Sequence, residues 1–347
     1  MEDIGGEDGI IDVHTHYVPR GWPDLRDEAG PDALWLDIVS ESDAIIKMGT
    51  REFRHIKSTA WDAETRVRDM NADGVARQVV SPTPAFFGYD LAPDSAAKVA
   101  RIFNDLALSI VEPCPDRLIP FCQVPLHDTD LACRELERCI ANGHRGVEIG
   151  NHVGDHDLDS AGVVTFLQHC AALDVPVFVH PWDMQSTSRL NRWMGQWLVG
   201  MPSETHLSIL ALILGGGFDV IDPRLRIAFA HGGGSFAFWL GRVENAWQQR
   251  NDVVGTSAYP PSHYIGRFYV DSVVFDDRAL RVLVDTVGAD RVLVGSDYPY
   301  PLGERPVGDV VRRSAFLDER QRRQIASENA LVFLGGSTPT SGLGRSA

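Results

Sequence analysis

Two histidines stand one residue apart near the start of the chain, at the end of an apolar run. In the stretch IIDVHTHYVP, His14 and His16 would lie on the same face of a β-strand, because alternate strand residues share a face. Three more side chains of similar chemistry end other apolar runs: His180 in PVFVH, His231 in RIAFAH and Asp297 in VLVGSD. Imidazole nitrogens with a carboxylate favour zinc, or else iron, manganese or cobalt. These residues therefore predict a divalent-metal site, if the fold brings them together.

The histidine pair alone is weak support for a metal site. A chain with 12 histidines in 347 residues contains about 0.4 such pairs by chance. A single histidine at a strand end is also more often a structural residue than a ligand. Three strands that end in histidine, with an aspartate after a fourth, are much harder to obtain by chance. The prediction therefore depends on the elements that position these side chains.

Eight short apolar runs alternate with helical patterns along the chain. The runs are nearly continuous in Val, Ile, Leu or Phe, as parallel strands covered on both faces should be. This alternation predicts an α/β fold, the (β/α)8 or TIM barrel, with its active site at the carboxyl ends of the strands. The runs span residues 10–16, 76–84, 118–126, 146–153, 176–181, 226–231, 268–273 and 291–297, and helical patterns span 61–74, 95–112, 130–143 and 235–247.

The organisation of the chain predicts one catalytic barrel domain over residues 1–335, because no flexible linker divides it. The last segment, 336–347, is rich in Gly and Ser and is predicted to be a flexible tail. Three connections are longer than a barrel requires: an insertion at 17–60 after the first strand, 182–202 after the fifth, and 251–265 before the seventh. The first two leave the carboxyl ends of strands, where such loops commonly carry function.

Composition and charge exclude several classes of partner. The net charge of −16 argues against nucleic acid or an anionic membrane, and an anionic substrate would need local arginines or a metal. No run of 18 apolar residues is present, and the acidic N-terminus is unlike a signal peptide. The five cysteines lack CxxC spacing, which favours reduced thiols. We therefore expect a cytoplasmic enzyme with no nucleic acid and no membrane partner.

Several long strings resemble one enzyme family. Histidines after strands 1, 5 and 6 with an aspartate after strand 8 follow the amidohydrolase-superfamily pattern, and the chain is more narrowly similar to the 2-amino-3-carboxymuconate-6-semialdehyde decarboxylase family over about residues 10–335. The resemblance implies a (β/α)8 fold, a mononuclear zinc site and non-oxidative loss of CO2 from a ring-cleaved aromatic acid, as in aromatic catabolism. The strings are FVHPWDM (178–184), WLVGMPSET (197–205), FAHGGGSFAFWLGR (229–242) and GSDYPYPLGE (295–304).

The resemblance also implies a role for each of the five candidate residues. It assigns one Zn²⁺ per subunit to His14, His16, His180 and Asp297, with a water completing the shell, and other divalent ions remain alternatives. It makes His231 the catalytic acid/base beside that water, and Asp297 would also steer the water. A nearby imidazole suits this role because it exchanges protons near neutral pH.

The alternative for His231 is a second metal ion. Binuclear amidohydrolases supply a bridging lysine or glutamate from strand 4, and this chain has Glu148 there, within GVEIG. Glu148 would point inward if its neighbours point outward. The decarboxylase family has uncharged residues at this position, so we interpret Glu148 as structural.

A dicarboxylate substrate needs cationic groups to bind it, and arginine meets a carboxylate bidentately. The resemblance implies Arg54 and Arg242 for this role, and it places Arg242 in the neighbouring subunit's site, which makes the active unit a homodimer. Trp193 is a candidate aromatic wall for the flat substrate. The chain departs from the family at Tyr300, where members have Phe, and at Thr50, near which several members carry a lysine.

Three alternatives to this reading remain open. In the first, the enzyme is a decarboxylase of the 2-hydroxy analogue of the semialdehyde, or of an intact aromatic acid such as resorcylate. A hydrolase of a lactone, amide or ester would use the same water to attack a carbonyl. A non-catalytic binding barrel is expected to have lost at least one ligand, and none is lost here.

Overall fold

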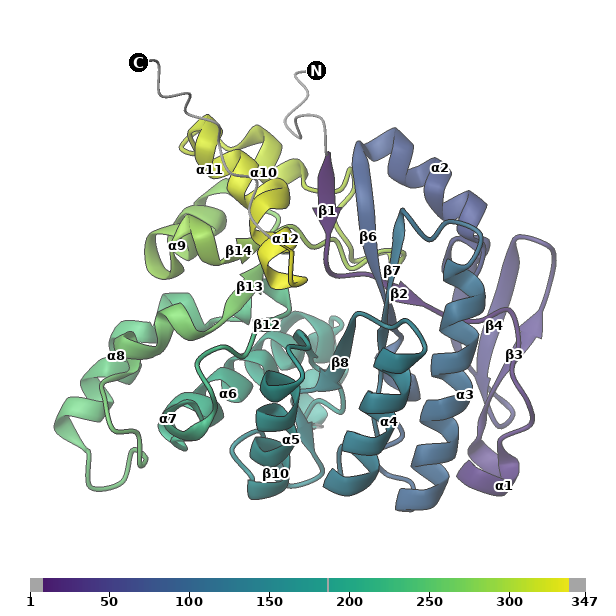
Figure 1. Ribbon diagram of the computed structural model, residues 1–347, viewed down its shortest axis with the longest axis horizontal. Coiled ribbons are helices and arrows are strands. Elements are labelled where there is room, and N and C mark those ends of the chain that lie inside the picture. The colour runs from purple at the N-terminus through teal and green to yellow at the C-terminus, as the bar shows by residue number, and fades with distance from the viewer. Residues whose placement is uncertain (1–8, 186, 337–347) are drawn as a thin grey trace.

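The computed structural model describes residues 9–185 and 187–336, and it confirms the predicted parallel barrel (Figure 1). The barrel strands follow one another in chain order. Every pair between hydrogen-bonded neighbours is parallel. The strands are β1 (Ile10–Asp12), β6 (Val75–Pro82), β7 (Leu118–Cys122), β8 (Gly146–Gly150), β11 (Val177–His180), β12 (Ile227–Phe229), β13 (Tyr269–Asp271) and β14 (Val292–Leu293), and β2 (His16–Tyr17) continues the first strand along β6.

The first and last strands meet through a few backbone hydrogen bonds, so the barrel is nearly closed. The N–H of Val13 donates to the carbonyl of Val294 (2.9 Å), and that of Asp297 donates to the carbonyl of His14 (2.9 Å). The predicted first run is interrupted between β1 and β2. This interruption and the closing bonds bring His14 and Asp297 to the same end of the barrel.

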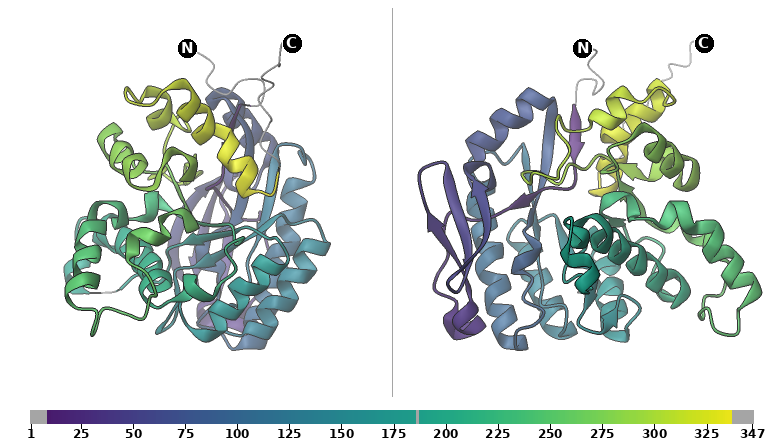
Figure 2. Two further views of the ribbon diagram at one scale, coloured as in Figure 1. Left: turned by 60° about the vertical axis from the view of Figure 1, so that its left-hand side comes forward. Right: turned by 180° about the vertical axis from the view of Figure 1, so that it is seen from behind.

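Helices cover the outside of the barrel, as Figures 1 and 2 show. Aspartate side chains cap four of them; for example, Asp62 accepts from the N–H of Thr65, and Asp128 from that of Leu131. Such caps satisfy N–H groups that a first turn leaves free. The helices are α1 (Arg26–Ala29), α2 (Ala63–Asp73), α3 (Pro93–Val111), α4 (Thr129–Ala141), α5 (Ala161–Ala172), α6 (Met201–Leu214), α7 (Gly217–Val220), α8 (Phe236–Gln249), α9 (Asp277–Val287), α10 (Asp309–Arg313), α11 (Glu319–Arg323) and α12 (Asn329–Phe333).

Alternation along each strand divides the core in two. On β11, Val177 and Val179 pack outward against the helices, whereas Phe178 packs inside the barrel. The interior cluster is otherwise apolar and includes Phe121 from β7 and Tyr269 from β13. It fills the barrel below its carboxyl end, so the polar side chains gather above it.

The insertion at 17–60 contains a small antiparallel sheet that lies beside α3 at the right-hand edge of Figure 1. Its strands are β3 (Leu34–Ile38), β4 (Asp43–Met48) and β5 (Arg51–Lys57), and its buried face packs on Phe103 of α3. After the fifth barrel strand, 182–202 forms a 3-10 turn (Ser188–Asn191) and a π-helical turn (Gln196–Gly200) that leads into α6. A two-stranded hairpin, β9 (His152–Val153) with β10 (His156–Asp157), follows β8.

The ends of the predicted domain are only partly covered. Residues 1–8 and 337–347 lie outside the described residues, so the predicted tail at 336–347 is outside them except for Gly336. The prediction of a single domain over 1–335 therefore stays a prediction.

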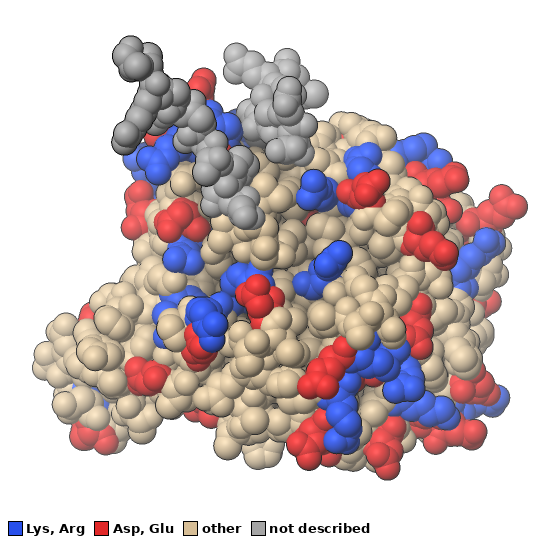
Figure 3. Space-filling view, in the orientation of Figure 1, with Lys and Arg blue, Asp and Glu red and all other residues tan. Residues whose placement is uncertain are grey.

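One helical segment, Gln196–Leu214, is long and apolar enough to cross a bilayer, with 19 residues and a mean hydropathy of 1.3. Length and composition are weak support for a membrane span, because core helices of soluble proteins also meet these two criteria. Of the most apolar stretch of this segment, 39% is buried inside the structure. The face in Figure 3 carries Lys and Arg interspersed with Asp and Glu rather than one basic patch. The absence of membrane and nucleic-acid partners stays a prediction.

Candidate metal centre

The five predicted side chains converge at the carboxyl ends of the barrel strands. The ring of His14 lies 5.2 Å from that of His16, and 5.1 Å from those of both His180 and His231. The Oδ1 of Asp297 lies 3.2 Å from Nε2 of His16 and 3.6 Å from Nε2 of His14. The structure therefore brings together all five side chains that the sequence places at the ends of strands.

Exposure distinguishes two of these residues from the other three. His14 and His16 are fully buried and His180 is 3% exposed. The side chains of His231 and Asp297 keep 15% and 13% exposure, so these two face the open mouth. His231 is thus the imidazole most accessible to a substrate.

The donor set fits a divalent ion. One donor atom each from His14, His180, His231 and Asp297 lies within 4.8 Å of all the others. His16 lies against the same carboxylate, so distance alone does not decide whether His16 or His231 completes the ligand set. The greater exposure of the His231 side chain favours the ligand set that the resemblance implies, in which His16 binds the ion and His231 does not.

The free nitrogens of the buried histidines support the same assignment. The Nδ1–H of His16 donates to the carbonyl of Pro82 (3.2 Å), and that of His180 to the carbonyl of Pro181 (2.9 Å). A proton on Nδ1 leaves the lone pair on Nε2, which is the ligating form of imidazole. The Nε2 atoms of His14, His16 and His180 are buried and have no hydrogen-bond partner among the described residues.

Asp271, which sequence reasoning missed, holds two of these groups in place. Its carboxylate accepts from Nδ1–H of His14 (2.6 Å) and from the backbone N–H groups of His231 (3.0 Å), Gly232 (2.8 Å) and Val273 (3.0 Å). Asp271 ends β13, so the rule that found Asp297 after β14 would have found it too. One buried carboxylate thus connects a metal ligand to the turn that carries the free imidazole.

Burial and hydrogen bonding set the charges of these groups. Burial lowers the pKa of His16 and of His180, which keeps both imidazoles neutral and able to ligate. Burial also opposes charge on His14, but the hydrogen bond to Asp271, together with the negative charges around the ring, raises the pKa of His14 to about 9. An ion must therefore displace a proton from His14 when it binds. Burial alone would raise the pKa of Asp297, but the neighbouring imidazoles of His16, His231 and His14 hold it well below its usual range.

The backbone at the two exposed site residues is strained. His231 has φ of 54° and Asp297 has φ of 60°, a region that non-glycine residues rarely adopt. Three glycines with positive φ follow His231, and a Cβ at the last of them, Gly234, would lie 2.0 Å from the carbonyl oxygen of Pro202 on α6. The glycines therefore let this turn pack directly against α6.

We expect Asp271→Asn to weaken metal binding by about 10- to 100-fold. The single amide oxygen of asparagine cannot accept from all four donors. The hydrogen bonds that orient His14 and hold the turn at His231 are therefore partly lost. The measurement is the Kd for Zn²⁺ by competition with a chromophoric chelator. Asp276→Asn, at the exposed cap of α9, is the matched control, and an unchanged Kd in Asp271→Asn would contradict the role of Asp271.

Arg54 lies next to the metal donors and has no acidic partner. Its guanidinium carbon is 4.5 Å from the ring centroid of Tyr300 and 5.4 Å from that of Phe53. The ring of Tyr300 lies 5.4 Å from that of His16, and its hydroxyl bonds to Oγ1 of Thr83 (2.6 Å). Among the described residues Arg54 forms no ion pair, so its guanidinium is available to an anion. The Tyr300 that departs from the family pattern thus helps to position Arg54.

The other predicted substrate-binding residues lie on the surface of the single chain. Arg242 is exposed on α8. Trp193 is 74% exposed, with its ring 4.2 Å from the guanidinium carbon of Arg192. Within the described chain, neither forms a hydrogen bond, ion pair or ring contact with the metal donors. Thr50 lies in the turn between β4 and β5, and the nearby Lys47 is paired with Asp37 (2.5 Å), so no lysine fills the position that the family uses.

Glu148 points into the barrel, as its strand position predicts. It is fully buried, and its Oε1 lies 3.8 Å from Nδ1 of His16. Burial raises the pKa of its carboxyl well above the ordinary value. Glu148 and Asp297 lie against opposite nitrogens of His16, Nδ1 and Nε2, so the geometry does not support Glu148 as a bridge between two ions.

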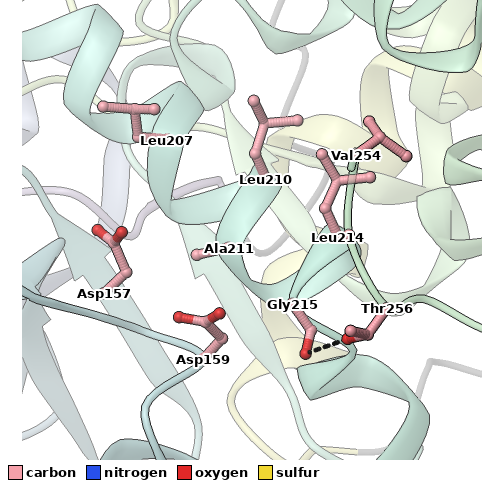
Figure 4. Close-up of a pocket in the computed structure, with 10 residues that line it drawn as sticks. Asp157, Asp159, Leu207, Leu210, Ala211, Leu214, Gly215, Val254 and Thr256 are labelled. Atoms are coloured by element: carbon pink, nitrogen blue, oxygen red, sulfur yellow. Dashed lines mark hydrogen bonds between the residues drawn. The ribbon is translucent and has the colours of Figure 1, made fainter. Parts of the chain in front are cut away.

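Two surface pockets lie away from the metal donors. One, of about 550 Å³, opens beside α6, with Asp157 and Asp159 on one side and Leu207, Leu210 and Leu214 on the other (Figure 4). The other, of about 620 Å³, lies in the inserted segment and is lined by aromatic and proline side chains, including Trp22 and Trp35. Neither contains a metal donor, so we do not assign the reaction to them.

Comparison with known proteins agrees with this geometry. A model of the family described as amidohydrolase matches residues 11–336. The chain is 38% identical to 2-amino-3-carboxymuconate-6-semialdehyde decarboxylase of Dictyostelium discoideum, over 94% of this chain and 91% of that protein. It is 32% identical to the protein of the same name from Caenorhabditis elegans, over 93% and 94%. A solved structure of dihydroxybenzoic acid decarboxylase from Polaromonas, with bound manganese, shares the fold, with a TM-score of 0.75 at 24% identity over 94% of this chain and 97% of that one.

Proposed function

The chain belongs to the amidohydrolase family, and on this premise we propose that it is a metal-dependent, non-oxidative decarboxylase. Its substrate is 2-amino-3-carboxymuconate-6-semialdehyde or a close ring-cleavage analogue. One observation carries the proposal: His231 reaches the open mouth beside buried metal donors, close to an arginine that has no acidic partner. Similarity to two decarboxylases of that substrate, over more than nine-tenths of the chain, supports the substrate class.

For the metal we propose one Zn²⁺ per subunit, held by His14, His16, His180 and Asp297. Three neutral imidazoles with one carboxylate suit zinc. Mn²⁺ is the alternative, because the solved dihydroxybenzoic acid decarboxylase carries manganese.

The residues of the site divide the chemistry between them. When bound, the divalent ion supplies positive charge that stabilises negative charge developing on the substrate. Arg54 binds a substrate carboxylate through its planar guanidinium. The carbon–carbon bond to the leaving CO2 breaks, and its electron pair stays on the substrate, where the conjugated aldehyde delocalises it. His231 holds a proton and delivers it to that carbon, then recovers a proton from solvent through the open mouth.

The experiment that tests the function is a decarboxylation assay with the purified protein. Freshly generated 2-amino-3-carboxymuconate-6-semialdehyde and its 2-hydroxy analogue are followed by absorbance, and released CO2 is trapped and counted. γ-Resorcylate and a panel of lactones and amides form the comparison set. CO2 release from a semialdehyde supports the proposal, whereas turnover of the lactones or amides without CO2 assigns the chain to the hydrolases.

We also propose that the enzyme works as a homodimer in which Arg242 reaches the partner's site. Its helix α8 exposes Phe238 (72%) and Trp239 (44%), which is unusual for a surface that stays in water. Figure 3 shows the region over α8, at the lower left, with few charged side chains. The segment before α6 exposes Leu198 and Val199 as well, so apolar area is available for a second copy.

A mixing experiment tests this arrangement directly. If each site takes Arg54 from one subunit and Arg242 from the other, Arg54→Gln and Arg242→Gln each raise KM steeply and have little activity alone. Refolded or co-expressed together, they form heterodimers with one intact site, so random mixing restores about one quarter of wild-type activity. Activity at low substrate concentration is the measurement.

The outcomes of the mixing experiment separate two arrangements. If both arginines served the same subunit's site, the mixture would stay as inactive as its parts. Arg51→Gln, at an exposed position on the same strand as Arg54, is the control and is expected to keep the wild-type KM. An unaltered KM in Arg54→Gln would count against carboxylate binding by Arg54.

For location, we propose the cytoplasm. All five cysteines are free thiols, and three of them are buried, namely Cys122, Cys139 and Cys170. Free buried thiols are typical of proteins kept in a reducing compartment. Cell fractionation with an antibody against the native protein would check it.

A further inference from the structure

Glu148 is a buried carboxyl group that the proposed reaction does not use. It lies at the centre of β8, inside the barrel, and its Cα is paired with that of Phe178 on β11. The residues on either side, Val147 and Ile149, pack outward in the apolar core. Neither carboxyl oxygen of Glu148 has a hydrogen-bond partner among the described residues. A buried acid without a partner is costly, so its position calls for a compensating charge.

The groups that face Glu148 identify where that charge would be. The nearest cation-forming atom is Nδ1 of His16, at 3.8 Å from Oε1, and the charge of His14 also lowers the pKa of Glu148. The other nitrogen of this ring, Nε2, points to Asp297 at 3.2 Å, on the metal side. The imidazole of His16 therefore lies between Glu148 and the metal donors. Ser81 on β6, whose hydroxyl lowers the pKa of Glu148, and Gln123, which follows β7, are also buried, but both are neutral.

Ligation changes the electrostatics of such a ring. When Nε2 binds a cation, positive charge spreads over the imidazole, and its Nδ1–H becomes a better donor. A carboxylate on the Nδ1 side of the ring is then attracted to the ring more strongly than it was before the ion bound. The carbonyl of Pro82 accepts from the same Nδ1 and holds the ring in this orientation.

We propose that Glu148 is a positioning residue of the metal centre, which acts through His16 to strengthen binding of the divalent ion. The inference rests on the metal-dependent function proposed above. Glu148 is not a ligand in this arrangement, because it lies on the Nδ1 side of His16, whereas Asp297 lies on the Nε2 side that would bind the ion.

The test compares Glu148→Gln with the wild type as apoprotein. Each is stripped of metal and titrated with Zn²⁺ against a chromophoric chelator, and the melting temperature is measured with and without the ion. We expect the Kd of Glu148→Gln to rise about 10-fold at an unchanged stoichiometry of one ion. We also expect the melting temperature of the apoprotein to stay level or rise, because an unpaired buried acid has been removed. A purely structural role would instead lower the melting temperature and leave the Kd unchanged.

Controls separate this inference from the function on which it rests. Glu135→Gln removes a buried carboxylate that is paired with Arg138 on α4, and it is expected to lower stability without changing the Kd. A Kd for Glu148→Gln within twofold of wild type overturns the inference while leaving the metal site intact. Two ions in the wild type that fall to one in Glu148→Gln make Glu148 a ligand and also overturn it. No ion binding by the wild type overturns the metal-dependent function itself.

A second variant covers the case in which Glu148→Gln does not fold. Glu148→Leu also removes the charge while filling the interior beside Phe178. If Glu148→Leu folds, its Kd is expected to rise in the same way. If neither variant folds, Glu148 is a core residue, and the inference is wrong.

Discussion

His231→Asn retains its metal ion and loses turnover by about 100- to 10,000-fold, the range that a positioned acid/base contributes. Among the five site residues, His231 is the imidazole that can deliver the proton that replaces CO2 on the substrate, because His14, His16 and His180 are buried beneath it. Asparagine keeps a polar side chain in the strained turn and cannot transfer the proton. Metal content by atomic emission and kcat on the semialdehyde are the two measurements.

The same variant decides between the two roles of His231. If His231 were a ligand, metal content would fall together with activity, as expected for the donor set that includes it. If the variant kept both its metal and the wild-type kcat, the acid/base role would be wrong. His169→Asn, on α5 and paired with Glu137, is the control and is expected to behave as wild type.

Removal of the divalent ion abolishes turnover. The charge that stabilises the developing anion is then gone. After dialysis against a chelator we expect activity below about 1% of the starting value, because metal charge stabilisation is worth several kcal/mol. Adding back one equivalent of Zn²⁺ restores it.

The add-back experiment also identifies the ion. Zn²⁺ and Mn²⁺ are titrated separately, and the kcat at saturation is compared with the metal found in protein purified from its own cells. Higher affinity and activity with Mn²⁺ would contradict the assignment of zinc but not the metal site. An apoprotein as active as the loaded one would contradict both. Because His14 must lose a proton when the ion binds, the apparent affinity is expected to weaken as pH falls below about 9.

Much of the site was decided by local sequence. Apolar runs of four to eight residues predict buried parallel strands, and the barrel that they form has one functional end. The side chains at the ends of those runs must then lie together, whatever the details of packing. This is why His180, His231 and Asp297 could be placed next to the pair at His14 and His16 without coordinates.

The tertiary structure alone decided which partner each of these groups has. Asp271 holds His14 and the turn at His231, and Tyr300 supports Arg54 from 246 positions away in the chain. The segment 17–60 was predicted only as an insertion after the first strand, and its antiparallel sheet and the position of Arg54 on β5 appeared only in the structure. Sequence periodicity reports which face of a strand is buried, and it carries no information about which distant residue lies opposite.

The sequence by itself thus determined the fold class, the end of the barrel that does chemistry and the five side chains gathered there. The structure added the order of exposure that separates His231 from the buried histidines, and the buried acids Asp271 and Glu148 that surround them. The physical reason is that strand formation depends on short-range alternation of apolar residues. Hydrogen bonds, burial and charge in the site depend on contacts between strands that the chain reaches only after it folds.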